Sequence, residues 1–369
     1  MAEPTTPIDV TNLQRPPAEV LYADELQRLA AEDRRPRPPG WRLSLQAVRR
    51  FVVGDPGLGI RRKFVGHSAL VDRAMVTLAT NRGLMLVGEP GTAKSLLSEL
   101  LAAAISGQST LTIQGGAATT DDQIKYSWNY ALLLAEGPTT RALVPAPLYL
   151  GMQQGKVVRF EEITRCPLEV QDSLLAVLSD RVLAVPELYG PEGMLFAHAG
   201  FNIIATANTR DRGVNEMSAA LKRRFNFETV FPIPDFQTEM DLVREETKRL
   251  LECAGVPSVP GDDVLEVLVT TFRELRSGET SEGQAMERLT TAMSTAEAVS
   301  VAYAVGVRGH YLGAGRATPG DVVECLAGAA AKDDKDDLAR LRQYLEQSVP
   351  KKKGAHWKAY HAARHLLPG

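Results

Sequence analysis

Short apolar runs alternate with amphipathic stretches through the middle of the chain. Four of these runs have the length of buried parallel strands, at residues 83–88, 109–114, 156–160 and 201–208. Two stretches between them carry an apolar stripe at helical spacing, at residues 95–105 and 167–180. Strands that alternate with helices predict an α/β fold, and we expect a three-layer αβα core with a parallel sheet over residues 41–235.

The pattern changes after residue 235, where the strand-like runs disappear. Long amphipathic stretches broken by glycine or proline fill residues 236–345. They predict an all-helical second domain, because helices commonly end at such breaks.

The two ends of the chain differ from both domains. Residues 1–40 carry seven prolines, and we expect a largely disordered arm there. Residues 20–33 can form a short helix within it, and docking to a partner is the alternative to plain disorder. Residues 346–369 are basic and rich in histidine, and we expect a solvated C-terminal tail.

Composition narrows the function classes. The net charge of −3 creates no global field that would draw the protein to nucleic acid or to a membrane surface. The three cysteines have no metal-ligand spacing and fit reduced thiols, which indicates a cytoplasmic protein. The N-terminal residues lack the apolar run of a signal peptide, and no window reaches the length of a membrane span.

A phosphate-binding loop is indicated by "GEPGTAKS", which lies between a predicted strand and a predicted helix. Its glycines permit a sharp turn, so that backbone N–H groups at the helix start can face an anion. Lys94 would reach the β- and γ-phosphates of a nucleoside triphosphate, and the Ser95 hydroxyl would bind Mg²⁺. The expected nucleotide-binding residues in this segment are Gly88, Glu89, Pro90, Gly91, Thr92, Ala93, Lys94, Ser95 and Leu96.

Ala93 stands where such loops usually have glycine. A methyl group costs little at negative φ and more at positive φ. Because a helix follows directly, we expect a negative φ at Ala93. The alternative for the whole motif is a chance glycine and proline turn ahead of a helix.

An acidic pair, Glu161 and Glu162, ends the predicted strand at residues 156–160. Phosphate hydrolysis needs one carboxylate near Mg²⁺ and another that orients or deprotonates water. Neighbouring side chains at a strand end point apart, so the pair can serve both purposes. Glu161 is one CH₂ longer than the usual aspartate, and we expect it to contact Mg²⁺ through water. Arg159 is unexpected inside this strand, and we place it where the strand meets a subunit boundary.

Two further motifs follow in the chain. Asn208 ends an apolar strand, and its amide can hydrogen-bond the γ-phosphate or the attacking water. Arg223 and Arg224 precede Phe225, and an arginine in this place can neutralise charge in a neighbouring site. The alternatives are a turn asparagine, a pair of surface glutamates and ordinary surface salt bridges.

Three segments in this order resemble the AAA+ ATPases, and more narrowly the MoxR family in the group with an insert in helix 2. They are "GEPGTAKS", "FEEITRCPLEVQDSLLAVLSDR" at residues 160–181 and "NTRDRGVNEMSAALKRRF" at residues 208–225. The second segment is the most specific, and the resemblance extends over about residues 60–345. MoxR-type loops often carry alanine before the lysine, so Ala93 is typical of this family.

The resemblance implies a P-loop core, a helical lid and a ring of six subunits, with ATP and Mg²⁺ bound between the subunits. Lys94 and Ser95 would hold the phosphates and Mg²⁺, with Glu161 assisting at the metal. Glu162 would be the catalytic base, and Asn208 the sensor of the γ-phosphate. Arg224 would be an arginine finger donated to the neighbouring subunit.

The resemblance also implies roles for three more segments. Val65 and Gly66 resemble the segment that packs on adenine. Residues 116–154 would hold the helix-2 insert, and residues 182–200 a hairpin near the pore or partner face. Ordinary loop elaboration is the alternative for both inserts.

Together these features lead to an Mg-dependent, ATP-hydrolysing ring protein that remodels or assembles a protein partner, as a chaperone does. MoxR relatives commonly work with partners that contain a von Willebrand factor A domain. A non-hydrolysing, ATP-gated scaffold is one alternative, because Ala296 or Glu297 stands where the family has a lid arginine. A DNA-dependent motor is another, with Trp357 and Tyr360 in a basic tail, but the negative charge argues against nucleic acid.

Overall fold

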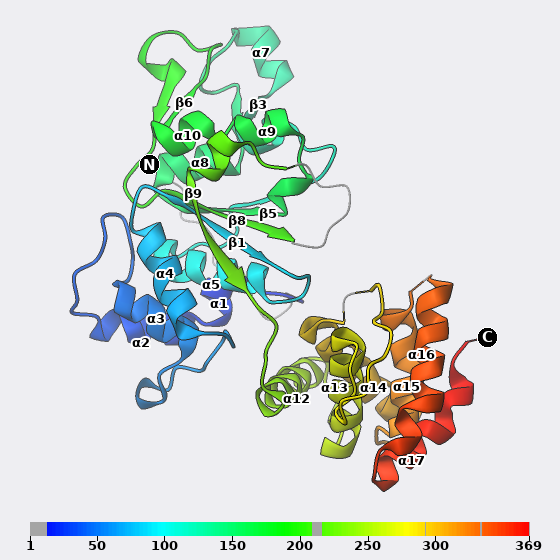
Figure 1. The fold of residues 1–369 in the computed structure, drawn as a ribbon. Helices are drawn as coiled ribbons and strands as arrows, with labels where there is room; N and C mark the ends of the chain where they lie inside the picture. The colour runs from blue at the N-terminus through cyan, green and yellow to red at the C-terminus, as the bar shows by residue number, and fades with distance from the viewer. Residues whose placement is uncertain (1–12, 209–215, 292, 333, 369) are drawn as a thin grey trace. The chain divides into compact units, whose positions relative to one another are not determined.

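The computed structural model describes residues 13–208, 216–291, 293–332 and 334–368 (Figure 1). They form two compact units. The first comprises the residues up to Gly88 together with Ala93–Val230, and the second comprises Glu89–Thr92 together with the residues from Phe231 onward. Within the described residues, no helix is long and apolar enough to cross a membrane.

Five parallel strands form the central sheet of the first unit, in the order β2-β5-β8-β1-β9. Their bounds are β1 Gly83–Gly88, β2 Thr112–Gln114, β5 Val157–Glu161, β8 Asn202–Asn208 and β9 Phe225–Val230. Four of them lie in the apolar runs that predicted strands. The fifth, β9, was not predicted, since it is an edge strand with exposed residues at Asn226 and Phe227.

Helices cover both faces of this sheet, as the three-layer prediction required. Leu84 and Leu86 of β1 face one hydrophobic cluster, and Met85 faces another, because successive side chains alternate across a strand. The first layer comprises α3 Leu45–Val53, α4 Ser68–Leu78 and α5 Lys94–Ser106. The second comprises α8 Pro147–Gln154, α9 Leu168–Asp172, α10 Leu175–Ser179 and α11 Ala219–Lys222.

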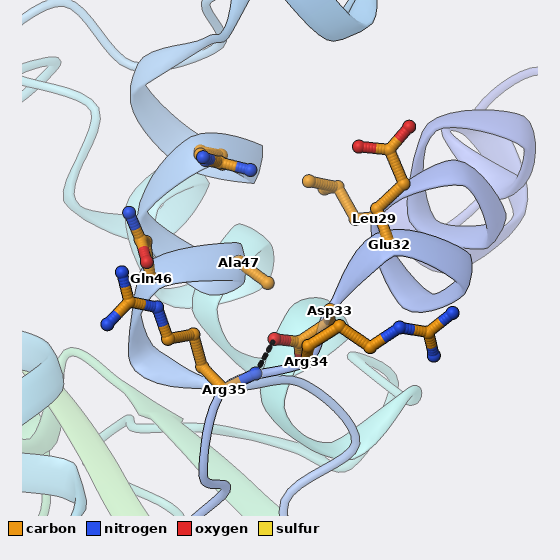
Figure 2. Close-up of a pocket in the computed structure, with 8 residues that line it drawn as sticks. Leu29, Glu32, Asp33, Arg34, Arg35, Gln46 and Ala47 are labelled. Atoms are coloured by element: carbon orange, nitrogen blue, oxygen red, sulfur yellow. Dashed lines mark hydrogen bonds between the residues drawn. The ribbon is translucent and has the colours of Figure 1, made fainter.

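The described part of the N-terminal segment differs from the largely disordered arm that the prolines suggested. Residues 18–32 form α1 Ala18–Leu21 and α2 Ala23–Glu32, and Ala18 and Leu29 are buried in the first cluster. Asp33 then pins the chain, because its carboxylate accepts hydrogen bonds from the backbone N–H and the hydroxyl of Ser44. Figure 2 shows a further bond to Asp33 from the backbone of Arg35. Burial and these hydrogen bonds hold the described part of the segment on the first unit.

Two insertions extend the first unit beyond its three layers. The first contains α6 Asp121–Ile124, α7 Tyr130–Glu136 and an antiparallel pair of β3 Tyr126–Trp128 and β4 Leu143–Pro145. The second contains the antiparallel pair of β6 Val182–Ala184 and β7 Met194–Phe196. Glu187 joins them, since it accepts hydrogen bonds from the Tyr126 hydroxyl at 2.9 Å and from the Trp128 indole at 3.4 Å. The two insertions therefore hold each other in place.

The second unit packs helices around one hydrophobic cluster. They are α12 Phe236–Cys253, α13 Asp262–Ser277, α14 Thr295–Tyr311, α15 Pro319–Ala330, α16 Lys335–Gln347 and α17 Ala355–Ala362. Short 3₁₀ turns occur in both units. In the first unit they lie at Pro56–Leu58, Ile163–Arg165 and Gly190–Gly193, and in the second at Val349–Lys351 and Ala363–Leu366.

The C-terminal segment is a part of this unit and not a solvated tail. Trp357 and Tyr360 are buried in its cluster, with 4% and 0% of their surface exposed. The Lys352 ammonium is buried as well and pairs with Glu274. Aromatic side chains that fill a core cannot stack on bases, which removes the main support for a DNA-dependent motor.

Candidate active site

The phosphate loop joins β1 to the N-terminus of α5. Lys94 is the first residue of α5, and its buried ammonium donates a hydrogen bond to the Gly88 carbonyl at 3.1 Å. Ser95 is the next residue, and it is exposed. Unpaired N–H groups at a helix N-terminus attract anions, so this end of α5 is suited to a phosphate.

The prediction for Ala93 was wrong, because its φ is +65° and its ψ is 26°. The residue caps α5 in the left-handed region, where the chain turns from the loop into the helix. A side chain there costs about 1 kcal/mol or more relative to glycine. Part of this cost is offset, since Ala93 packs against the hydrophobic cluster below α5.

Glu161 lies at the end of β5 and points toward α5. Its Oε2 accepts hydrogen bonds from the Ser95 hydroxyl at 2.7 Å and the Thr206 hydroxyl at 2.8 Å. Its Oε1 accepts a hydrogen bond from the Ser98 hydroxyl at 2.7 Å. Burial would raise the pKa of Glu161, but the charge of Arg159 and the three hydroxyl groups outweigh burial and lower it. The carboxylate is therefore ionised and directed at the serine that was predicted to bind metal.

Arg159 does not lie at an exposed boundary of this subunit, in contrast to the expectation from sequence. It is 9% exposed, and its guanidinium donates hydrogen bonds to Glu161 Oε1 at 2.8 Å and to Ser98 Oγ at 2.9 Å. Residues two apart on a strand share a face, so Arg159 and Glu161 both face α5. Pairing with a buried carboxylate makes a buried guanidinium tolerable.

Glu162 follows in the left-handed region, with a φ of +55°. Its backbone N–H donates to the Thr206 hydroxyl at 3.0 Å, and its carboxylate pairs with Arg165 at 2.8 Å. Strained backbone of this kind persists where surrounding contacts hold it, and it is common at active sites. Gly115 lies so close that an added Cβ would come within 2.4 Å of the Glu162 carbonyl oxygen. The close approach of Gly115, the residue after β2, therefore limits where the chain at Glu162 can leave the sheet.

Asn208 lies beside the start of the phosphate loop because β8 pairs with β1. It pairs in register with Gly88, the last residue of β1. The carboxyl ends of β1, β5 and β8 thus bring together Gly88, Glu161 and Asn208, as the sequence motifs predicted. In doubly wound α/β sheets, ligands bind at this edge.

Val65 and Gly66 lie just before α4, where Val65 is half-buried and Gly66 is exposed. Gly66 packs against the Phe64 ring so closely that an added Cβ would come within 2.5 Å of it. Their predicted contact with adenine stays a prediction.

Arg224 lies at the opposite edge of the sheet. Its carbonyl accepts a hydrogen bond from the backbone N–H of Gly83, the first residue of β1. Its guanidinium donates to Ser179 Oγ at 2.9 Å and to the Ala220 carbonyl at 2.7 Å. The neighbouring Arg223 is exposed. β1 separates this edge from the phosphate loop by about 16 Å, at 3.3 Å per residue, which is farther than an arginine side chain reaches.

The donor set fits Mg²⁺ in the manner of a phosphate-loop protein. The Ser95 hydroxyl and the Glu161 carboxylate supply hard oxygen atoms that lie 2.7 Å apart. Among the described residues, no group of three or more His, Cys, Asp or Glu side chains could hold a metal. Mg²⁺ commonly takes one or two protein ligands and fills its shell with water and substrate phosphates, so a two-residue set is sufficient.

A separate cavity of about 180 Å³ lies between α2 and α3 (Figure 2). Its lining includes Asp33, Arg35 and Arg50. None of the residues that the motifs predicted for the site lines this cavity, and it belongs to the contact of the N-terminal segment with α3.

Two residues of the site were missed from sequence. Thr206 lies inside the apolar strand β8, and Ser98 lies one turn after Ser95 on α5. The spacing of three residues between Ser95 and Ser98 puts both hydroxyl groups on one face of the helix, which is a signal that could have found Ser98. Thr206 carries no comparable signal, because threonine is common in strands.

Two sequence families match this chain. Residues 83–225 match the AAA domain of the dynein-related subfamily, and residues 237–368 match the C-terminal domain of YehL-like AAA+ ATPases. The first match contains the phosphate loop, the acidic pair and Asn208. The second covers the helical unit, including the C-terminal segment that packs into its core.

Three curated proteins are similar to this chain. The uncharacterized protein YehL of Escherichia coli K12 is 64% identical over 357 residues, which cover 97% of this chain and 98% of that protein. The gas vesicle ATPase GvpN2 of Halobacterium salinarum is 26% identical, with 61% of this chain and 66% of that protein covered. The chaperone MoxR1 of Mycobacterium tuberculosis is 27% identical, with 50% and 45% covered. The chain therefore belongs to the YehL-like AAA+ ATPases, which are of the MoxR type, and it is an ATP-hydrolysing enzyme.

Proposed function

We propose that this protein is an Mg-dependent ATPase that assembles into a ring of six subunits and remodels a protein partner; the ring of six rests on the resemblance to the MoxR family. The observation that carries the proposal is the meeting of Lys94, Ser95, Glu161 and Asn208 at the carboxyl edge of the sheet. The membership in an ATPase family argues against the non-hydrolysing scaffold. We place the protein in the cytoplasm, and cell fractionation would check this location.

Each residue of the site has a distinct task in hydrolysis. The Lys94 ammonium leaves the Gly88 carbonyl and binds the β- and γ-phosphates, while backbone N–H groups at the start of α5 face the same anion. Ser95 and Glu161, whose oxygen atoms lie 2.7 Å apart, are the groups that would hold Mg²⁺, which would supply positive charge to the phosphates. Asn208 donates its amide N–H to the γ-phosphate or orients water.

Glu162 completes this set as the base. Its carboxylate exchanges the Arg165 contact for the attacking water, accepts a proton from it and so raises its nucleophilicity. The carboxylate of Glu162 pairs with Arg165 and that of Glu161 with Arg159, so the two carboxylates have different partners and can serve separate tasks.

The position of Arg224 supports assembly. Since it lies at the edge of the sheet opposite to the phosphate loop of its own chain, it can reach a γ-phosphate only in a neighbouring subunit. An arginine provided in this way neutralises charge that develops during phosphoryl transfer. It also makes hydrolysis depend on the contact between subunits.

Exposed apolar side chains on the two insertions support a protein partner. Tyr130 and Leu134 project from α7, and Tyr189 and Phe196 from the β6–β7 hairpin, and each is at least 65% exposed. We call these four residues the insertion surface. Exposed apolar side chains that lie together commonly mark protein contacts, and the hydrogen bonds of Glu187 hold together the two insertions that carry these four. A partner with a von Willebrand factor A domain is our specific proposal, on the resemblance to MoxR proteins.

Assembly and turnover are expected to rise together. ATP turnover per subunit should be low in dilute protein and should climb over the concentration range in which sedimentation detects assembly. Removal of Mg²⁺ with EDTA should abolish turnover at every concentration. A monomer that hydrolyses ATP at the full rate would contradict the proposal.

The insertion surface is expected to bind the partner. ATP-bound Glu162→Gln protein, with Leu134→Ser and Phe196→Ser added, should recover about tenfold less partner from cell extract than Glu162→Gln alone. Leu312→Ser is the matched control, since Leu312 is equally apolar and 75% exposed on the second unit. Mass spectrometry identifies the partner, and one that lacks a von Willebrand factor A domain would refute the specific proposal.

A further inference from the structure

Arg159 is a buried charge for which neither the fold nor the hydrolytic mechanism gives a reason. Its neighbours on β5 are Val158 and Phe160, which fill the core on the other face. A buried guanidinium is costly unless its N–H groups find acceptors, and an apolar residue of similar size often serves stability equally well. The contacts of Arg159 should therefore indicate what the charge accomplishes.

Those contacts connect the acidic end of β5 to the first turn of α5. The terminal nitrogen Nη2 donates to Glu161 Oε1 at 2.8 Å and to the Ser95 carbonyl at 3.0 Å. The Nε atom donates to Ser98 Oγ at 2.9 Å, and Nη1 donates to the Ser109 carbonyl at 3.2 Å. The guanidinium is thus held on three sides, and it contacts both Glu161 and the backbone of Ser95.

The two oxygen atoms of Glu161 have different surroundings as a result. Oε1 accepts hydrogen bonds from Arg159 and Ser98. Oε2 is left to the hydroxyl groups of Ser95 and Thr206. A glutamate has one more rotatable bond than an aspartate, so it needs an additional anchor to present one oxygen atom at a fixed place.

We propose that Arg159, together with Ser98, is a positioning pair that fixes Glu161 so that Oε2 and the Ser95 hydroxyl are presented together to Mg²⁺. The pair compensates for the length of Glu161, where other phosphate-loop proteins use aspartate. The inference rests on the proposed Mg-dependent function. Arg159 and Ser98 then help to set the affinity of the site for Mg²⁺. Residues that orient a metal ligand typically change metal affinity by about 10- to 100-fold when they are replaced.

Arg159→Lys is the direct test, because it keeps the positive charge and loses the planar fork that bonds two acceptors. The readout is the binding of a fluorescent ADP analogue without turnover, titrated with MgCl₂. We expect the Mg²⁺ concentration that gives half of the maximal change in analogue binding to rise about tenfold. The affinity for the analogue in EDTA should be unchanged. Ser98→Ala should act in the same direction, and it serves if the lysine variant does not fold.

Two further variants sharpen the test. Thr112→Val is the matched control, since Thr112 Oγ1 contacts Arg159 at 3.5 Å and has no bond to Glu161. It should leave the Mg²⁺ dependence as in the unaltered protein. In a Glu161→Asp background, Arg159→Lys should have much less effect than in the unaltered protein, because the shorter carboxylate no longer reaches the arginine. Such non-additivity is the signature of a direct pair.

The outcomes separate this inference from the proposed function. An unchanged Mg²⁺ dependence in both Arg159→Lys and Ser98→Ala would overturn the positioning role, as would an equal loss of affinity with and without Mg²⁺. If Mg²⁺ does not affect nucleotide binding in the unaltered protein, the Mg-dependent function itself fails.

Discussion

Replacement of Arg224 with alanine is expected to lower ATP turnover about 1,000-fold while leaving the affinity of a single subunit for ATP nearly unchanged. The physical reason is the distance along the sheet. Arg224 lies beside the first residue of β1, and the phosphate loop follows the last residue of β1. The hydrogen bonds to Ser179 Oγ and the Ala220 carbonyl orient the guanidinium before it meets a neighbour. A guanidinium has five N–H donors, so two such bonds leave others for a phosphate.

Arg223→Ala is the matched control, because it removes the same chemical group one residue earlier. It should retain turnover within about twofold, as surface charges contribute little. Addition of Arg224→Ala protein to the unaltered protein at constant total concentration should suppress turnover, because each mixed contact loses its arginine. If Arg223→Ala is the inactive variant instead, the assignment of the trans-acting arginine moves by one residue, and if both variants are active, the assignment fails.

Glu162→Gln is expected to reduce turnover by about 10²- to 10⁴-fold, the usual contribution of a general base. The amide matches the carboxylate in shape but cannot accept a proton from water. Nucleotide binding should persist, since the loop residues and the Glu161 cluster are unaltered. Stopped-flow binding of a fluorescent ATP analogue and steady-state turnover separate the two effects.

Glu169→Gln makes the same chemical change on the exposed first turn of α9 and controls for lost charge near the site. Its turnover should match that of the unaltered protein. A Glu162→Gln protein with full turnover would exclude Glu162 as the base. Loss of nucleotide binding in that variant would show that Glu162 acts through the structure of the loop and not through the water.

Long apolar runs made most of the sheet predictable, because a strand buried on both faces is mostly apolar. The edge strand β9 lacks that property, and its Glu228 pairs with Arg73 of α4, so its pattern resembles a loop. The expectation of a largely disordered arm at the proline-rich N-terminus was wrong for another reason, since α1 and α2 form there. Proline stiffens a chain but does not prevent it from packing, and the anchors of that segment, such as Asp33 with Ser44, join residues distant in sequence.

The site was predictable as far as its residues follow strand ends. Glu161 and Asn208 could be brought to the phosphate loop because parallel strands end at one edge. The conformation of Ala93 and the partners of Arg159 could not be derived in this way. The first depends on how sharply the loop enters α5, and the second on how closely α5 packs against β5.

The burial of Trp357 in the helical unit has a spectroscopic consequence. Trp41 is buried in the first unit, and Trp128 lies half-buried on β3 of the first insertion. Each of these three parts thus contains a single indole, and indole emission shifts to longer wavelength when water reaches the ring. Replacement of any two with phenylalanine leaves a protein whose fluorescence follows one part alone, so that nucleotide, partner and denaturant can each be watched where they act.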